Sequence, residues 1–177
     1  ARDGLHNDEV FATLKDCYGR YWYGTEGGIT IFKKNTPPRY ITTENGLTNN
    51  KIRCFYQEDS NYIWVGTENG ASKIDIRIKS LPVVSSITKK DGLNGEQVNC
   101  IFRDRRKNIW FGLGDGSVNI LKQGTLLKHK TPKKLDRVYA ISEDQYHNIW
   151  IATHGNGLFT CESGSTNFKY PEVNAQL

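Results

Sequence analysis

The sequence predicts an all-β protein, a β-propeller segment with four blades of four antiparallel strands each. Three observations carry this prediction. A short motif, in which tryptophan stands two residues before glycine or alanine, recurs four times and uses all four tryptophans of the 177-residue chain. The tryptophans are 42, 46 and 40 residues apart, a period typical of propeller blades. No segment shows a helical period of useful length, so radially repeated four-stranded units fit best. The tryptophans are Trp22, Trp64, Trp110 and Trp150.

Each copy begins with a Gly-Leu turn, except the fourth, which has Leu135-Asp136 instead. A short apolar strand follows, and one aliphatic residue in it, called the anchor here, precedes the tryptophan by 12 residues in every copy. Such constant spacing indicates one repeated structure. The anchors are Val10, Ile52, Val98 and Val138. We expect the blades to cover residues 4–44, 45–90, 91–134 and 135–177.

An acidic residue follows each anchor by six positions and precedes a polar turn, whose backbone N–H groups it can bond. These acids are Asp16, Glu58, Asp104 and Asp144. The tryptophan strand comes next, and a glycine-containing turn closes a hairpin with the third strand. A weaker fourth strand is expected before each following copy, and over residues 167–170 in the last. Because a blade buries its apolar faces only against its neighbours, the tryptophans are the natural filling between blades.

The clearest copy, residues 46–70, contains Gly-Leu, a β-branched anchor, an acid, Ile63-Trp64-Val65-Gly66-Thr67 and Asn69-Gly70. This pattern resembles the two-component regulator propeller repeat, and the resemblance covers essentially the whole chain. The fourth copy departs from it, because Ala152 replaces glycine and the turn at His154 has one extra residue. The resemblance implies a periplasmic sensor region of a hybrid sensor histidine kinase, of the kind found in Bacteroides-like bacteria.

The same resemblance implies that carbohydrate fragments released by polysaccharide breakdown are the signal. It also implies a larger ring, of which these four blades form a part; a closed four-bladed ring is the alternative. The histidine kinase would lie elsewhere in the intact protein, so this segment is expected to be non-catalytic. The expected partners are an oligosaccharide, further propeller blades or a dimer partner.

The net charge of +5 and the pI of about 9.0 weakly favour anionic or polyhydroxylated partners. The basic runs lie in or beside turns, so we interpret them as a solvated rim rather than a nucleic-acid surface. No apolar run reaches the length of a membrane span. No cofactor or metal is expected, because the glycine-rich turns lead into strands and the histidines and cysteines lack zinc spacing. Cys54 and Cys100 share a slot with two alanines, which indicates packing residues.

Ligand contacts are expected at slots that differ between the copies and lie near the mouth of the central channel. The residues just before and just after each anchor meet both conditions. Aromatic rings stack on sugars, while Arg, Asn and Gln side chains bond hydroxyl or carboxylate groups. Ordinary loop variation and core aromatic residues are the alternative interpretation. The ligand-binding candidates are Phe11, Lys51, Arg53, Gln97, Asn99, Arg137, Tyr139 and His154.

The functional hypothesis is therefore a non-catalytic sensor segment that binds carbohydrate fragments. Two alternatives remain open: a protein–protein interaction scaffold without a small ligand, and a sialidase-like carbohydrate-active enzyme. The acid-to-tryptophan segment is similar to the Asp-box of sialidase-type propellers, but its spacing of six residues is one residue longer. A glycosidase needs paired carboxylates, and nothing in the sequence pairs Glu9, Glu96 and Asp136 near the mouth.

Overall fold

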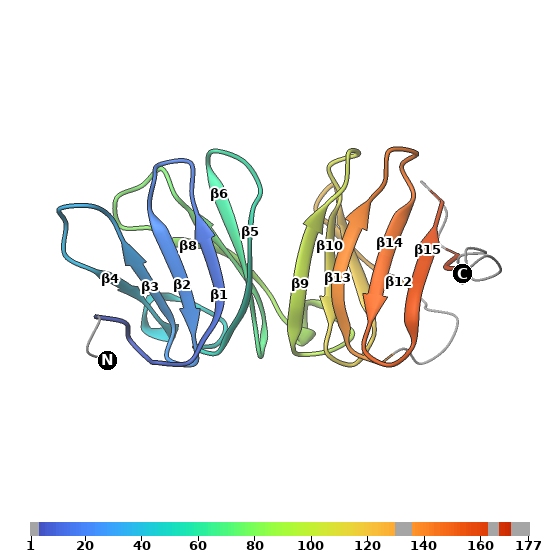
Figure 1. Cartoon of the computed structure of the whole chain (residues 1–177), viewed down its shortest axis with the longest axis horizontal. Helices are drawn as coiled ribbons and strands as arrows, with labels where there is room; N and C mark the ends of the chain where they lie inside the picture. Colours follow the sequence, from blue (N-terminus) through green and yellow to red (C-terminus); the bar gives the residue numbers. More distant parts are fainter. Residues whose placement is uncertain (1–3, 130–135, 163–166, 171–177) are drawn as a thin grey trace.

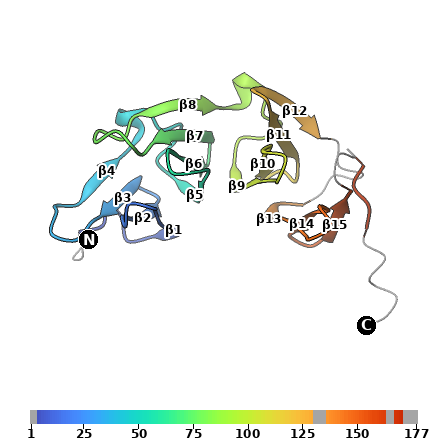
Figure 2. The ribbon, with the colours of Figure 1, turned by 90° about the horizontal axis from the view of Figure 1, so that it is seen from above.

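The computed structural model describes residues 4–129, 136–162 and 167–170. These residues form four separate antiparallel sheets that follow one another along an arc (Figure 1, Figure 2). The two ends of the arc do not meet in Figure 2. The predicted all-β propeller fold is confirmed, and the four blades form part of a ring rather than a closed one.

Blades one to three have four strands each, joined in simple meander order. The strands of blade one are β1 (Val10–Lys15), β2 (Tyr21–Thr25), β3 (Ile29–Phe32) and β4 (Arg39–Ile41). Those of blade two are β5 (Ile52–Gln57), β6 (Tyr62–Thr67), β7 (Gly70–Asp75) and β8 (Val83–Ile87). Those of blade three are β9 (Val98–Arg103), β10 (Ile109–Leu113), β11 (Val118–Lys122) and β12 (Thr125–His129).

Blade four differs from the expectation of four strands. Among the described residues it has three, β13 (Val138–Glu143), β14 (Ile149–Thr153) and β15 (Gly157–Cys161). The strand expected over residues 167–170 is reduced to a bridge, in which Thr160 and Lys169 exchange two backbone hydrogen bonds of 2.9 and 2.7 Å. Pro171 follows directly in the sequence and has no N–H to continue a ladder.

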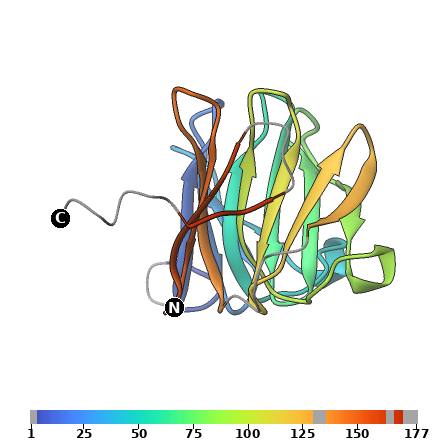
Figure 3. The ribbon, with the colours of Figure 1, turned by 90° about the vertical axis from the view of Figure 1, so that its right-hand side faces the viewer.

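The innermost strands, β1, β5, β9 and β13, line the concave side of the arc (Figure 2). Each runs from the lower edge of Figure 1 to the upper edge, and the tryptophan strand returns to the lower edge. Figure 3 shows the strands of all the sheets running between the same two edges. The molecule therefore has an upper edge, made by the acid-containing turns, and a lower edge, made by the hairpin turns and the segments that lead into the inner strands.

The upper edge repeats one hydrogen-bond pattern in all four blades. The acid accepts a hydrogen bond from the indole N–H of its tryptophan, at 2.8 Å between Asp16 and Trp22 and 2.9 Å in the other three blades. In blades one, three and four its other oxygen accepts backbone N–H groups of the turn, as the sequence predicts. In blade two the longer Glu58 bonds the indole, and Asp59 accepts the turn N–H groups.

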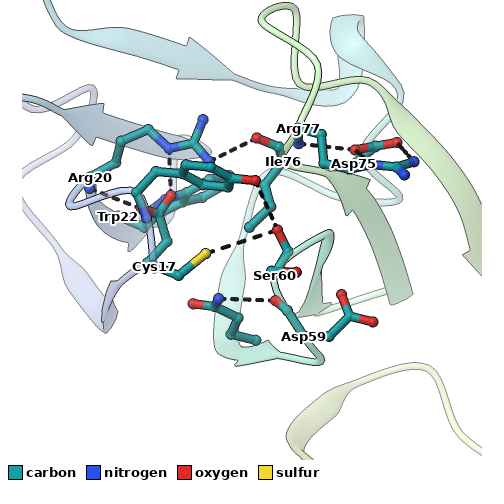
Figure 4. Close-up of polar contacts among 11 residues, drawn as sticks. Cys17, Arg20, Trp22, Asp59, Ser60, Asp75, Ile76 and Arg77 are labelled. Atoms are coloured by element: carbon teal, nitrogen blue, oxygen red, sulfur yellow. Dashed lines mark hydrogen bonds and ion pairs between the residues drawn. The ribbon is translucent and has the colours of Figure 1, made fainter.

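Polar contacts also join neighbouring blades at the upper edge, as Figure 4 shows for blades one and two. The Arg20 guanidinium donates to the carbonyl of Ile76 at 3.0 Å, while its Nε binds Asp16 at 2.5 Å. Tyr18 donates its hydroxyl to the carbonyl of Ser60 at 3.2 Å. Blade one is therefore held to blade two through backbone carbonyls, which do not depend on the side chains of blade two.

Each of the first three tryptophans packs against the next blade, which explains their regular recurrence. Trp22 shares a core cluster with Ile52, Ile63 and Val65 of blade two, and it is fully buried. Trp64 and Trp110 are 2% and 5% exposed. Trp150 is only half-buried, and no further blade packs against it within the described residues.

The glycine after each of the first three tryptophans makes room for the anchor of the next blade. A Cβ atom on Gly24 would lie 2.5 Å from Ile52 Cγ2, and one on Gly112 would lie 2.5 Å from Val138 Cγ1. A Cβ on Gly66 would lie 2.7 Å from the Val98 carbonyl oxygen. The fourth blade has Ala152 in this slot, and no anchor lies against it among the described residues.

Cys54 and Cys100 lie opposite these glycines in the register, paired with Gly66 and Gly112. Their Sγ atoms come within 2.5 Å of where a glycine Cβ would stand. Burial raises the pKa of the Cys100 thiol to about 12, and that of Cys54 further. Both thiols are free, so these residues act as small packing groups, in agreement with the sequence interpretation.

Two single-turn 3-10 helices, η1 (Thr43–Asn45) and η2 (Lys89–Asp91), are the helical elements of the described residues. The predicted Gly-Leu turns come directly after them, where Gly46 and Gly92 take the left-handed conformation that ends each helix. Neither helix, nor any other helix in the described part of the chain, is long and apolar enough to cross a membrane.

Candidate ligand-binding site

The residue after each anchor is a β-bulge in all four blades. In blade one Val10 pairs with Thr25 and Ala12 with Gly24, so that Phe11 has no partner in the ladder. The same shift of register leaves Arg53, Asn99 and Tyr139 unpaired in the other inner strands. A bulge turns its extra residue out of the regular alternation, and bulges are frequent beside functional sites. The variable slot identified in the sequence is therefore also a special backbone position.

In blades two, three and four the residue before the anchor lies at the lower edge, against the hairpin turn of its own blade. The carbonyl of Lys51 accepts the N–H of Glu68 at 3.0 Å, and that of Gln97 accepts the N–H of Gly114 at 2.9 Å. In blade four, Arg137 receives the N–H of His154 at 2.9 Å. The structure thus brings the candidates before the anchor and the turn residues to the same edge.

In blades two and three, the side chain before the anchor is engaged by the hairpin turn of the preceding blade. Lys51 forms an ion pair with Glu26 of blade one. Gln97 donates from Nε2 to Glu68 Oε1 of blade two at 3.3 Å. The corresponding turn residue of blade three is Gly114, which has no side chain. The guanidinium of Arg137 is therefore left without a hydrogen bond or ion pair within the described part of the chain.

The bulged residues of blades one to three are also engaged by the protein itself. The Arg53 guanidinium lies 5.0 Å from the ring centroid of Phe11 and forms an ion pair with Glu68. Asn99 donates from Nδ2 to the carbonyl of Val138 at 3.1 Å. Glu68 thus holds Arg53 and Gln97 together, a role that the sequence reasoning missed. Glu68 follows Thr67 in the hairpin turn just as Glu26 follows Thr25 in blade one, so the sequence did not distinguish the two glutamates.

Blade four presents a different arrangement, which we call the blade-four cluster: Asp136, Arg137, Tyr139 and His154. Tyr139 is 52% exposed, and its ring lies nearly perpendicular to that of His154, with centroids 5.8 Å apart. His154 Nδ1 lies 3.1 Å from Asp136 Oδ2, and both side chains are more than half exposed. The backbone N–H of Arg137, and then the His154 ring, lower the pKa of the Asp136 carboxyl. The cluster therefore offers a cation, an aromatic face and an ionised carboxylate to solvent.

The eight candidates accordingly form two groups. Five of them serve contacts within and between blades one to four: Phe11, Lys51, Arg53, Gln97 and Asn99. The other three, Arg137, Tyr139 and His154, lie together and have side chains open to solvent. Asp136 joins this second group; the sequence reasoning considered it only as a carboxylate near the mouth. Within the described residues no group of His, Cys, Asp and Glu has the geometry to hold a metal ion.

These features define a segment of a β-propeller, with repeated packing at the upper edge and blade-specific side chains at the lower edge. The repeat described as "two component regulator propeller" matches residues 46–69, 92–115 and 134–155, which fall on blades two, three and four. Three of the four repeats thus match this repeat model, and the resemblance found in the sequence is confirmed.

The chain is similar to two proteins of two-component signalling. A relative from Formosa agariphila, named histidine kinase P4, is 27% identical over 157 residues, which cover 82% of this chain and 12% of the kinase. The extracellular domain of a Bacteroides thetaiotaomicron protein, assigned to the hybrid two-component systems, has a TM-score of 0.76 and 25% identity. The match covers 93% of this chain and 23% of that one. The chain thus spans less than a quarter of either relative.

Virginiamycin B lyase from Staphylococcus aureus has the same fold, with a TM-score of 0.72. The match covers 93% of this chain and 56% of the lyase, at 14% identity. At this level of identity the likeness shows the propeller fold alone.

Proposed function

We propose that the chain is a non-catalytic, extracytoplasmic sensor segment of a two-component signalling protein and that it binds saccharide fragments. The repeat family and the two relatives in two-component signalling support the sensor assignment. The extracellular domain among those relatives supports a location outside the cytoplasm, and the periplasm is the compartment we propose. The histidine kinase would lie in another part of the intact protein.

The blade-four cluster is the observation that carries the proposed saccharide site. Tyr139 is exposed and offers a ring on which a pyranose can stack, and Arg137 offers a guanidinium without a hydrogen bond or ion pair within the described residues. Asp136 and His154 can accept and donate hydrogen bonds to hydroxyl groups. Binding sites for polar ligands combine an apolar surface with a few convergent polar groups, and this cluster has both.

Binding would engage Arg137 directly before the inner strand β13, Tyr139 on that strand and His154 on the turn after β14. A ligand that bridges these two elements would stabilise one arrangement of the hairpin of blade four over others. A signal requires such a difference in affinity between two arrangements, because a ligand that binds both equally shifts nothing. The proposed role of this segment is therefore to convert saccharide binding into a shift of blade four.

Isothermal titration calorimetry with a panel of neutral and acidic oligosaccharides tests this function. The double variant Arg137→Gln/Tyr139→Ala should lower the affinity for a bound saccharide about tenfold or more, since two main contacts are removed. A matched pair at the upper edge, Arg105→Gln/Tyr146→Ala, should leave the affinity unchanged. Absence of heat with every saccharide, or equal losses in both variants, would overturn the proposed site.

The two alternatives give different results in the same mixtures. An interaction scaffold would give no saccharide heat but a stoichiometric complex with a partner domain. An enzyme would release shortened or unsaturated sugars, which chromatography detects. Two of the three candidate carboxylates lie beside basic side chains rather than beside a second carboxylate, which does not favour the enzyme: Asp136 contacts His154, and Glu96 pairs with Lys89.

A further inference from the structure

A groove lies at the junction of blades two and three, away from the blade-four cluster. Its volume of about 470 Å³ is within the range of small-ligand pockets. None of the residues that line it belongs to the eight sequence candidates. The groove is lined by Asn69, Thr88, Lys89, Lys90 and Glu96.

The walls of the groove are held by a backbone hydrogen bond and by the Asp91 carboxylate, which is not among the lining residues. The N–H of Gly70 donates to the carbonyl of Glu96 at 2.7 Å and ties the hairpin turn of blade two to the segment before β9. The Asp91 carboxylate accepts both the N–H and the hydroxyl of Thr88 at 2.8 Å, which closes the start of η2. The residues that line the groove then offer a ligand the amide of Asn69, the ammonium groups of Lys89 and Lys90 and the carboxylate of Glu96.

The ammonium groups of Lys89 and Lys90 make no strong interaction with the groups around them. Lys89 Nζ lies 3.9 Å from Glu96 Oε1, and the two side chains are 61% and 64% exposed. An exposed pair at this distance contributes little to stability, so a ligand can replace it at small cost. Within the described residues, Lys90 makes no hydrogen bond or ion pair through its ammonium group.

The equivalent junction of blades one and two differs at the positions that matter. There the slots of Lys89 and Lys90 hold Thr43 and Glu44, so the basic pair is replaced by a neutral and an acidic residue. The slot of Glu96 holds Asn50, whose Oδ1 accepts the N–H of Thr43 at 2.7 Å. The same backbone framework therefore carries two lysines and an open carboxylate at one junction, and a self-contained contact at the other.

We propose that the groove between blades two and three binds an anionic saccharide, one that carries a carboxylate or a sulfate group. The two lysines would donate charge-assisted hydrogen bonds to the anionic oxygens. Glu96 and the Asn69 amide would bond the sugar hydroxyl groups, which need acceptors as well as donors. A bare inorganic anion would leave these acceptors unused. The inference rests on the proposed sensing function only for the class of ligand.

The test is a calorimetric titration of the 177-residue chain with three oligosaccharides of equal length, one neutral, one uronate-containing and one sulfated. The variant Lys89→Thr/Lys90→Glu copies the residues of the blade one–two junction into the groove. We expect it to weaken binding of the uronate or the sulfated oligosaccharide about tenfold or more, since two ionic contacts are lost. Whether the uronate-containing or the sulfated oligosaccharide binds more tightly shows which anionic group the groove prefers.

The matched control is Lys33→Thr/Lys34→Glu, which makes the same change of charge at an exposed lysine pair outside the groove. It should change the affinity less than about twofold, because exposed charges at a distance are largely screened. Equal weakening by the two variants, or absence of binding by both anionic oligosaccharides, would overturn the groove proposal.

The control Arg137→Gln/Tyr139→Ala separates this inference from the proposed function. If it abolishes neutral saccharide binding while the lysine variant abolishes only the anionic component, both sites stand. If it removes anionic binding while the lysine variant has no effect, the blade-four cluster is the sole site and the groove proposal is wrong.

Discussion

The upper and the lower edge of this propeller segment are built on different rules. At the upper edge one hydrogen bond, from indole to carboxylate, occurs in all four blades at 2.8 or 2.9 Å. At the lower edge the corresponding slots hold Lys51, Gln97 and Arg137, and each has a different environment. A contact that every blade repeats supports the architecture. A slot whose neighbours change from blade to blade is free to acquire specificity.

The lower edge itself divides in the same way. In blades two and three the side chains before the anchor are bound by Glu26 and Glu68 of the preceding blade, and Glu68 also pairs with Arg53 of its own blade. In blade four the partner slot is Gly114, and the side chains of Arg137 and Tyr139 face solvent. Whether the side chain before the anchor is exposed therefore depends on one residue, the one that occupies the hairpin turn of the preceding blade.

The largest expected effect on stability is at Trp64. Replacement by Ala should lower the free energy of unfolding by about 3–5 kcal/mol, because it empties the packing between blades two and three. Trp150→Ala, at the half-buried equivalent, should cost clearly less. Urea unfolding followed by circular dichroism measures both, with Trp64→Phe as a milder variant. Equal costs at the two positions would contradict the view that each tryptophan serves the following blade.

A smaller loss is expected from a single added methyl group at the same junction. Gly66→Ala should destabilise the chain by about 1–3 kcal/mol, because its Cβ would meet Cys54 Sγ and the Val98 carbonyl. Ala152→Gly, the reverse change in blade four, removes no crowding and should cost no more than about 1 kcal/mol. Both are measured by the midpoint of urea unfolding. If Gly66→Ala leaves the stability unchanged, the anchor Val98 does not need the space that the missing Cβ of Gly66 provides.

Within the lower edge, Arg53 and Arg137 should respond differently to loss of the guanidinium. Arg53→Ala leaves Glu68 without its ion-pair partner and should cost about 1–3 kcal/mol. Arg137→Ala should stay within about 0.5 kcal/mol of the wild type, as expected for a surface position. Thermal unfolding of the two variants, measured side by side, compares the two losses of stability. Similar losses would mean that Arg137 is as structural as Arg53.

The hydrogen bonds of the upper edge should also make the stability of the fold depend on pH in the acid range. The indole of Trp150 donates to Asp144 and, with Asn148 and the turn N–H groups, lowers the pKa of its carboxyl to about 2. Since this folded-state pKa lies below the unfolded value of about 3.9, the carboxylate stabilises the fold above pH 4. That contribution is lost as the pH falls from about 4 towards 2.

Asp144→Asn should therefore flatten the fall in stability between pH 4 and pH 2. The comparison of urea midpoints across this range, wild type against variant, measures the effect. Lys33→Gln, at an exposed position after β3 in blade one, supplies the control variant, which should leave the slope unchanged. If stability falls with pH as steeply in Asp144→Asn as in the wild type, the bond between Asp144 and the indole does not stabilise the fold as proposed.

Most of the architecture followed from the repeat alone, because spacing reports backbone geometry. The constant distance from anchor to tryptophan predicted the two inner strands of every blade, and the acid six residues before the tryptophan was correctly assigned to the turn. The indole bond was missed, since the period does not reveal that the carboxylate turns back towards the tryptophan. The fourth strand of blade four was overestimated, because a two-residue bridge and a strand begin with the same apolar pattern.

The candidate site was only partly predictable. The slots beside the anchors were identified, but their bulged conformation depends on how two strands pair, which sequence does not show. Whether a side chain in such a slot is free depends on the neighbouring blade, as Gly114 and Glu68 illustrate. The groove at Lys89 and Lys90 is formed by segments about 20 residues apart that no local pattern joins.

The most direct test of the central claim is a ¹H–¹⁵N NMR titration of the chain with a saccharide that binds in calorimetry. The claim is that the upper edge is architecture and the lower edge carries specificity. Backbone shifts should then be confined to the lower edge, at Arg137, Tyr139 and His154 or at Asn69, Lys89 and Glu96. The indole N–H signals of the four tryptophans should stay in place. Shifts centred on those indole signals and on the acid-containing turns, with a silent lower edge, would contradict the account.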